Sequence, residues 1–324
     1  MKQTVLRIVT LLLAFLMLLS AAACSNNGNA TDPGSTKSAA PAQQTEAKIF
    51  SDEGLELELN EDSASYSVKG IGTCKDKDVV IPASYNGKPV TEIGEKAFEY
   101  CGSLTSVTIP DGVTVIGERA FNRCESLTSV TIPDSVTVID IAAFEACNNL
   151  TNVTIPSSVT KLCPYVFCAC DKLTSVTIPD SVTKLCPYVF CACDKLTSVT
   201  IPDSVTEIGQ CAFAECTSLT SVTIPDSVTK IDDSAFQTCT SLTSVTIPDS
   251  VTEIGDHAFC NCDNLASVTI GSGVTEIGAS AFYYCTGLET VNYRGTEAQW
   301  AQISMKNNYD ELKNAVIVYN YTGE

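Results

Sequence analysis

The sequence has little of the chemistry on which most enzymes depend. Its 324 residues include one histidine, His257, one tryptophan and three methionines. A single imidazole leaves little for a His-based triad, a His-rich zinc site or an imidazole general base. Basic residues are also scarce, since 19 Lys and Arg stand against 38 Asp and Glu, and the formal charge of -19 repels phosphate backbones and anionic lipid. We therefore predict no enzyme, no cofactor and no nucleic-acid partner.

A long apolar run occurs only near the N-terminus. Lys2 and Arg7 precede an uncharged stretch from Ile8 to Ala23 that is rich in leucine. A charged start followed by an apolar segment of this length is typical of a signal peptide, and the segment is short for a membrane span. We predict a signal peptide over residues 1–23. Plain secretion after a cut of the A-x-A kind and a retained anchor are the alternatives.

The apolar run ends in small residues that stand directly before a lone cysteine, Cys24. This arrangement resembles a bacterial lipobox, although Ala21 stands where that pattern usually has leucine. The resemblance implies a lipoprotein, exported and held at the bacterial cell surface only by a lipid on Cys24. Residues 25–48 contain no large apolar side chain. We therefore predict a disordered tether over residues 24–48 that carries an extracellular domain.

One unit recurs along the rest of the chain at intervals of 23 residues. It reads L-x-x-V-x-I-P-x-x-V-x-x-I/L-x-x-x-A/V-F-x-x-C, and such a fixed period with this spacing of leucine, valine and isoleucine indicates a leucine-rich-repeat solenoid. Each unit contains a phenylalanine and, three positions later, a cysteine, which we predict to form a structural ladder: Phe98, Cys101, Phe121, Cys124, Phe144, Cys147, Phe167, Cys170, Phe190, Cys193, Phe213, Cys216, Phe236, Cys239, Phe259, Cys262, Phe282 and Cys285.

The pattern within one unit predicts the shape of a coil. From Ser106 to Ile109, valine and isoleucine alternate with serine and threonine, which predicts a strand with one buried and one solvated face. Pro110 ends the strand, and Val113 and Ile116 form a second apolar step on the opposite side. No coil can bury this set alone. We predict a mostly β solenoid with short turns or helices, whose coils stack into one long parallel sheet with strands about 4.8 Å apart.

The unit resembles that of the BspA-like leucine-rich-repeat proteins, which carry the same L-x-x-V-x-I-P and A-F-x-x-C elements. The resemblance covers roughly residues 50–324. It implies the same solenoid fold, and it implies adhesion to host matrix proteins or contacts between bacteria.

Both ends of the repeat carry segments suited to capping it. Alternating leucines and acids near residue 57, followed by Tyr66 and Val68, predict an amphipathic hairpin. Thr296 to Gln299 has capping-box spacing, with Trp300 following on the same helical face as Ile303. We predict an N-terminal β cap with a first-coil insertion over residues 49–89, a solenoid over 90–293 and a C-terminal cap over 294–324.

The solvated strand positions form the first candidate binding surface, a flat hydroxyl face able to bind extended glycan or ordered water. The alternative is that serine and threonine simply suit a solvated strand. The candidate residues of this face are Ser106, Thr108, Ser129, Thr131, Thr154, Ser175, Thr177, Ser198, Thr200, Ser221, Thr223, Ser244 and Thr246. The turns around each phenylalanine vary far more between units, so specific recognition is expected there or at the caps. These variable positions are Glu118-Arg119, Ile141-Ala142, Gln210-Cys211, Asp233-Ser234, Asp256-His257 and Ala279-Ser280.

Two further columns admit a chemical and a structural interpretation. Within the repeats, six further cysteines could form a metal cluster or paired disulfides: Cys163, Cys168, Cys186, Cys191, Cys211 and Cys260. Residues 161–183 and 184–206 are identical, so an internal duplication explains why their cysteines are aligned without any chemical role, and we predict no metal site.

An aspartate follows the proline in several units and could bind calcium, but it is more often a turn residue.

These observations together predict a binding or adhesion module for host matrix or other surface proteins. A glycan-binding surface protein and a passive structural spacer without a specific ligand are the alternatives. The assignment to adhesion rests on the family resemblance, because a fold alone does not fix a function.

Overall fold

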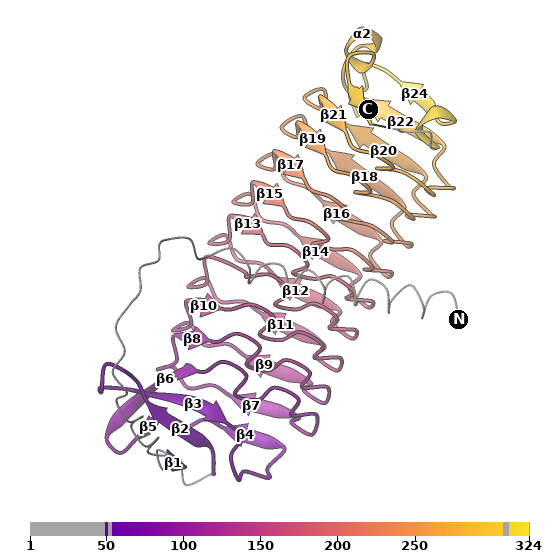
Figure 1. The fold of residues 1–324 in the computed structure, drawn as a ribbon. Helices are drawn as coiled ribbons and strands as arrows, with labels where there is room; N and C mark the ends of the chain where they lie inside the picture. The colour runs from indigo at the N-terminus through magenta and orange to yellow at the C-terminus, as the bar shows by residue number, and fades with distance from the viewer. Residues whose placement is uncertain (1–48, 51–53, 307–310, 324) are drawn as a thin grey trace, which may run out of the picture. The chain divides into compact units, whose positions relative to one another are not determined.

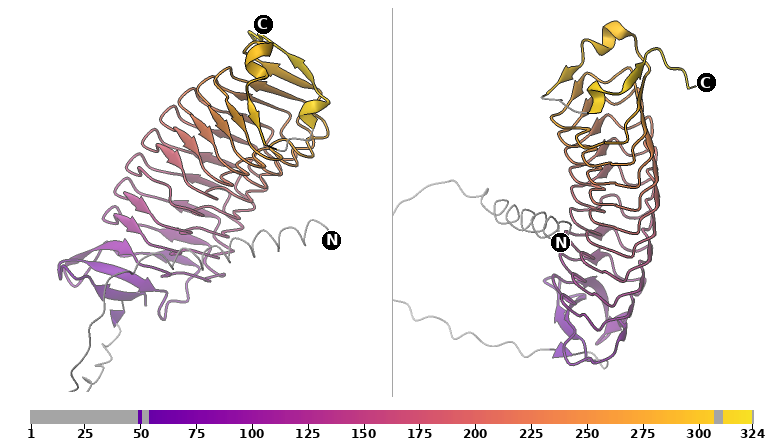
Figure 2. Two further views of the ribbon diagram at one scale, coloured as in Figure 1. Left: turned by 45° about the horizontal axis from the view of Figure 1, so that its top comes forward. Right: turned by 90° about the vertical axis from the view of Figure 1, so that its right-hand side faces the viewer.

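The computed structural model describes residues 49–50, 54–306 and 311–323, which belong to one compact unit spanning residues 47–324. The predicted signal peptide (1–23), the candidate lipid site Cys24 and the tether (24–48) lie outside the described residues. The described part is a solenoid of short strands and turns, stacked coil upon coil from the N-terminal hairpin to the C-terminal cap (Figures 1 and 2).

The predicted long parallel sheet is confirmed, and it has eleven strands. Each strand pairs with the strand one repeat away, so that Ser106 lies opposite Ser129 and Val107 opposite Val130. The strands in order are β4 (Asp78–Val80), β7 (Ser106–Thr108), β9 (Ser129–Thr131), β11 (Asn152–Thr154), β12 (Ser175–Thr177), β14 (Ser198–Thr200), β16 (Ser221–Thr223), β18 (Ser244–Ile247), β20 (Ser267–Ile270), β22 (Thr290–Tyr293) and β24 (Val316–Val318).

The second apolar step of each coil forms a parallel row of its own, where the sequence had predicted one sheet (Figure 1). Its strands are β6 (Lys88–Ile93), β8 (Val115–Ile116), β10 (Val138–Ile139), β13 (Lys184–Leu185), β15 (Glu207–Ile208), β17 (Lys230–Ile231), β19 (Glu253–Ile254), β21 (Glu276–Ile277) and β23 (Ser304–Met305). Single bridges through Leu162 join β10 to β13. The row forms because two residues in extended conformation suffice to pair with the equivalent residues of the coils on either side.

The N-terminal hairpin covers the first coil of this second row. Strand β1 (Ile49–Phe50) pairs with β2 (Glu56–Leu59), which pairs antiparallel with β3 (Tyr66–Gly70). Strand β3 then pairs parallel with β6, whose start also pairs antiparallel with β5 (Ser84–Tyr85). The hairpin does not extend the main sheet, whose first strand is β4. This strand precedes residue 90, the predicted start of the solenoid.

The C-terminal cap closes the other end. Helix α2 (Glu297–Trp300) begins with the predicted capping box, in which the Thr296 hydroxyl accepts from Gln299 N and the Gln299 carboxamide oxygen accepts from Thr296 N. Trp300 packs edge-on against Tyr293, with ring centroids 5.1 Å apart. A 3-10 turn, η1 (Glu311–Lys313), leads into β24, the last strand.

The ladder phenylalanines form one stack through the interior. Each ring is 0% exposed, and successive ring centroids lie 5.1 to 5.8 Å apart with nearly parallel planes. Beside them, the thiol of each ladder cysteine from Cys124 to Cys285 donates to the carbonyl of the preceding coil's phenylalanine, as Cys124 does to Phe98 O at 3.1 Å. Ring stacking and thiol bonds therefore both connect neighbouring coils.

The turn around each phenylalanine adds a third ladder of backbone bonds. Tyr165 N donates to Pro187 O at 3.2 Å, and Ala169 N donates to Cys191 O at 2.7 Å. These donors have left-handed backbone, and across the solenoid two non-glycine residues per turn have φ between 53° and 63°. Such a conformation costs about 1 kcal/mol per residue. The left-handed conformation persists because it points the backbone N–H along the solenoid axis, where the N–H donates to a carbonyl of the next coil.

Candidate functional site

The predicted hydroxyl face lies on the outer side of the main sheet. In β14, Ser198 and Thr200 are exposed while Val199 between them is 6% exposed. The same alternation recurs from β7 to β18, so all the predicted face residues point to solvent and are exposed or half-buried. The side chains hardly change from coil to coil. This face is therefore a repetitive surface and not a tailored pocket.

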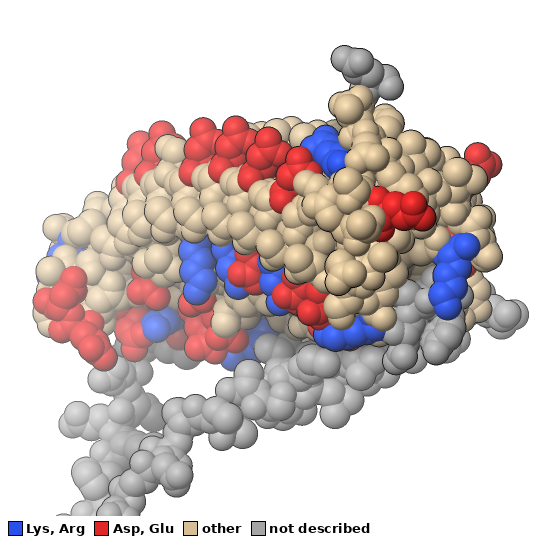
Figure 3. All heavy atoms as spheres, turned by 90° about the horizontal axis from the view of Figure 1, so that it is seen from above, with Lys and Arg blue, Asp and Glu red and all other residues tan. Residues whose placement is uncertain are grey.

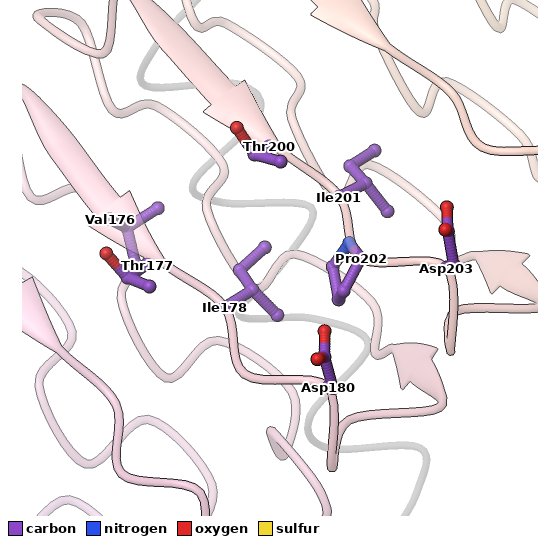
Figure 4. Close-up of a pocket in the computed structure, with 8 residues that line it drawn as sticks. All are labelled: Val176, Thr177, Ile178, Asp180, Thr200, Ile201, Pro202 and Asp203. Carbon is purple, nitrogen blue, oxygen red and sulfur yellow. The ribbon is translucent and has the colours of Figure 1, made fainter.

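A shallow hollow of about 360 Å³ lies where β12 and β14 end (Figure 4). Threonines stand on one side, aspartates on the other, and isoleucine and proline side chains lie between them. Its lining residues are Val176, Thr177, Ile178, Asp180, Thr200, Ile201, Pro202 and Asp203. Because the sequence T-I-P-D recurs in other coils, the hollow offers the chemistry of the whole face, which is hydroxyl and carboxylate groups beside an apolar strip.

The aspartates after the proline form a row along the solenoid. Figure 3 shows a row of acidic side chains along one edge, separated by uncharged atoms from a mixed row of basic and acidic ones. The exposed members of the column are Asp111, Asp134, Asp180, Asp203, Asp226 and Asp249. The Asp249 carboxylate accepts from Ser272 N at 2.7 Å and pairs with Arg294 at 3.5 Å. The backbone bond from Ser272 is the main cause that lowers the pKa of Asp249, and here the aspartate acts as a turn residue.

The mixed charges of the second row pair with one another. Lys184 bonds to Glu207 at 2.8 Å, Lys230 bonds to Glu253 at 3.2 Å, and Lys306 contacts Glu276. Exposed pairs of this kind contribute about 0–1 kcal/mol each. They link adjacent coils.

The cysteines outside the ladder do not share one environment. Burial, together with the nearby Asp140 carboxylate, raises the pKa of the Cys163 thiol to about 11. Cys168 and Cys191 instead lie together in a small buried cluster with Cys211 and Ala214. Within residues 49–50, 54–306 and 311–323, no group of three or more His, Cys, Asp or Glu side chains is placed to hold a metal ion.

The most varied surface lies around the ladder phenylalanines. We define the turn edge as the segments that begin two residues before each of these phenylalanines and end two residues after it, from Lys96–Tyr100 to Ser280–Tyr284. Tyr100 is 65% exposed and Tyr284 51%, and the Arg123 guanidinium lies over the Tyr100 ring at 5.5 Å. His257 is also exposed on this edge. Aromatic, basic, acidic and small side chains thus replace one another from coil to coil.

The middle of the turn edge is apolar. Cys168, Cys191, Cys211 and Ala214 form a small buried cluster apart from the main core, and Tyr165 and Tyr188 pack against it. The two tyrosine rings stack with centroids 4.6 Å apart. On one side of this cluster lies Glu145, whose pKa is raised by burial against the opposing effect of Arg119 and Arg123.

Sequence reasoning found the variable turns but missed how they are organised. The tyrosine and cysteine cluster can be seen in the sequence only when the residues two before and one after each phenylalanine are read as columns. The left-handed positions gave no signal, because no glycine marks them: Tyr165, Tyr188 and Arg119 occupy them instead.

Comparison with known proteins identifies the repeat. The description "BspA type Leucine rich repeat region (6 copies)" matches residues 91–216 and 183–309. No protein of curated function matches the chain. None of the helices in the described residues is long and apolar enough to cross a membrane.

Two solved structures are similar to this chain. A leucine-rich repeat protein from Bacteroides ovatus is 26% identical with a TM-score of 0.64, and the match covers 85% of this chain and 79% of that one. A leucine rich cell surface protein from Faecalibacterium prausnitzii is 28% identical with a TM-score of 0.48, covering 82% of this chain and 99% of that one. With repeat, coil geometry and matched family in agreement, the chain belongs to the BspA-type leucine-rich-repeat family.

Proposed function

We propose that this protein is an exported lipoprotein of the bacterial surface whose turn edge binds host matrix or other surface proteins. The observation that carries the proposal is the contrast between the two long surfaces of the solenoid. The hydroxyl face repeats one chemistry, whereas the turn edge changes its side chains at nearly every coil. A surface that distinguishes one protein from another needs such variety.

The side chains of the turn edge suit protein recognition. Tyr100, Tyr284 and Arg123 belong to the residue types that are enriched at protein interfaces, where aromatic rings and guanidinium groups supply most of the binding energy. Backbone bonds to the next coil hold two of them, since Tyr100 N donates to Asn122 O and Arg123 N donates to Glu145 O, both at 2.8 Å. A rigid backbone lowers the entropy that binding must overcome.

The hydroxyl face supports a second candidate, binding of an extended polysaccharide. The hollow between Thr177, Thr200, Asp180 and Asp203 combines hydroxyl and carboxylate groups with an apolar strip, and sugars present hydroxyls and apolar C–H faces that match both. The recurrence of this chemistry suits a repeating ligand better than a single protein epitope.

One binding experiment separates these functions. The full chain, kept reduced, is tested against immobilised matrix proteins, mucin and polysaccharides, with an unrelated acidic solenoid as control. Saturable binding to a protein supports the primary proposal, and saturable binding only to a polysaccharide supports the second. Binding equal to the control across the whole panel contradicts both and leaves the passive spacer.

A further inference from the structure

One junction between neighbouring coils is held less tightly than the others. It lies where residues 160–177 face residues 183–200, between the two copies of the repeat that are identical in sequence, and we call it the seam. The rings of Phe167 and Phe190 stack across the seam with their centroids 5.8 Å apart, whereas those of Phe98 and Phe121 lie 5.1 Å apart. The widest spacing of the phenylalanine stack therefore falls at the seam.

The main sheet is loosened at the same junction. Strands β12 and β14 share one register pair, Thr177 with Thr200, whereas β14 and β16 share three. At every other junction of the described main sheet, the residue that precedes the strand donates its N–H to the neighbouring coil, as Thr220 N does to Thr197 O at 3.1 Å. Thr197 N forms no such bond with Thr174 O. The hollow shown in Figure 4 opens between these same two strands.

The second row is loosened there as well. In the other coils, a glycine or aspartate after the second apolar step donates its N–H to the coil before it, as Gly209 N does to Leu185 O at 2.9 Å. Cys163 and Cys186 occupy this place in the two identical copies. Their coils are joined there only by single bridges through Leu162. Two sides of the coil, the main sheet and the second row, are therefore weakly bonded across the seam.

A Cys-Pro sequence accounts for the weak contacts in the second row. Cys163-Pro164 and Cys186-Pro187 stand where the next coil has Gly209-Gln210. The residue before a proline is restricted to extended backbone, so its N–H has less freedom to turn toward the coil before it. Within the described solenoid, these two coils alone carry proline at this place, and they are also the two that lack the direct bond.

The third side of the coil, the turn edge, keeps its bonds across the seam. Tyr165 N donates to Pro187 O at 3.2 Å, and Ala169 N donates to Cys191 O at 2.7 Å. Beside these bonds the rings of Tyr165 and Tyr188 stack with centroids 4.6 Å apart. One side of the seam is therefore firmly held, while the other two sides are not.

We propose that the seam is a hinge at which the solenoid bends. The coils on its two sides move as two rigid blocks, and the turn edge is the pivot because its bonds are intact. The main sheet and the second row separate as the hinge opens, which widens the hollow between Asp180 and Asp203 on the hydroxyl face. The hinge is a property of the coil contacts and does not depend on which ligand the protein binds.

Two pairs of spin labels test the hinge in the full chain by double electron–electron resonance. Labels at Thr108 and Thr223 lie five steps apart in the strand order with the seam between them, and labels at Thr200 and Val318 lie five steps apart on one side of it. All four side chains are exposed, and both separations are about 24 Å. The labels are attached through a noncanonical amino acid, so that the cysteines stay unlabelled. We expect a broader distance distribution for the pair that spans the seam, and equal widths would overturn the proposal.

A variant tests the cause. Cys186→Gly/Pro187→Gln gives the seam the residues of the next coil and should narrow the distribution between Thr108 and Thr223 to the width of the other pair. Ile141→Gln is the matched control, because it changes the same turn position in a coil whose Asp140 N already donates to Ile116 O at 2.9 Å.

The control variant should leave the width unchanged. No narrowing in Cys186→Gly/Pro187→Gln while circular dichroism shows the native fold, or equal narrowing in both variants, contradicts the proposal. If the first variant does not fold, the comparison of the two label pairs in the otherwise unchanged chain still decides.

Discussion

The buried thiols of the Cys ladder predict a steep loss of stability at alkaline pH. Burial is the main cause that raises the pKa of six of them far above the ordinary value of about 8.5: Cys124, Cys147, Cys170, Cys193, Cys216 and Cys239. All six are 0% exposed. In the unfolded chain they ionise near the ordinary value, whereas in the solenoid they keep their protons.

The sign and size of the effect follow from proton linkage. A group whose folded-state pKa is raised contributes stability that is fully present below its unfolded-state pKa and is lost as the pH rises above it. At about pH 9.5, one unit above the unfolded value, each thiol lowers the free energy of unfolding by about 1.4 kcal/mol. For six thiols the loss is about 8 kcal/mol, comparable with the whole stability of about 5–15 kcal/mol of a folded domain.

The assay is denaturant unfolding followed by circular dichroism at several pH values from neutral to about 9.5, with reductant present throughout. Cys216→Ala should remove one titrating thiol and weaken the pH dependence by about 1.4 kcal/mol over this range. Val205→Ala, a truncation of a fully buried apolar side chain, should lower the stability without changing the pH dependence. An unfolding midpoint that stays constant up to pH 9.5, or equal pH dependence in the two variants, would refute the reasoning.

Three further outcomes are expected. Phe213→Ala removes a ring whose centroid lies 5.6 and 5.4 Å from those of its two stacked neighbours. It should lower the free energy of unfolding by about 3–5 kcal/mol. A loss below about 1 kcal/mol would show that the stack is not needed. Gly209→Ala should destabilise by about 1–3 kcal/mol, because its Cβ would lie 2.4 Å from Leu185 O, whereas Gly102→Ala, with nothing within 4 Å, should be neutral; equal denaturation midpoints would contradict this. Cys24→Ser should abolish incorporation of labelled fatty acid in cells and release the protein from the membrane fraction, and continued labelling would exclude Cys24 as the lipid site.

The period and the strand of each coil could be predicted from the sequence because they depend on local alternation. The segment from Ser106 to Ile109 fixes which face is buried, and Pro110 fixes the end of the strand. The second row was underestimated, because two residues such as Val115 and Ile116 carry no periodicity of their own. They become a strand only when the neighbouring coils supply hydrogen-bond partners on both sides.

The thiol contacts could not be predicted. Residues 161–183 and 184–206 are identical in sequence, so the spacing of Cys163 and Cys186 is the same as that of Cys168 and Cys191. Their difference comes from what surrounds each side chain in three dimensions. The Asp140 carboxylate in the preceding coil helps to raise the pKa of the Cys163 thiol, while Cys168 lies in a small buried cluster with Cys191, Cys211 and Ala214.

The measurement that tests the proposed function most directly compares two surface variants of the full chain for binding to the matrix protein that the wild type binds. One variant changes the turn edge, Tyr100→Ser with Arg123→Ser, and the other changes the hydroxyl face, Ser198→Ala with Thr200→Ala. Recognition through the turn edge predicts at least about a tenfold loss of affinity in the first variant, which corresponds to 1.4 kcal/mol, and no change in the second. Unchanged affinity in the first variant together with lost affinity in the second would contradict the account and assign binding to the hydroxyl face.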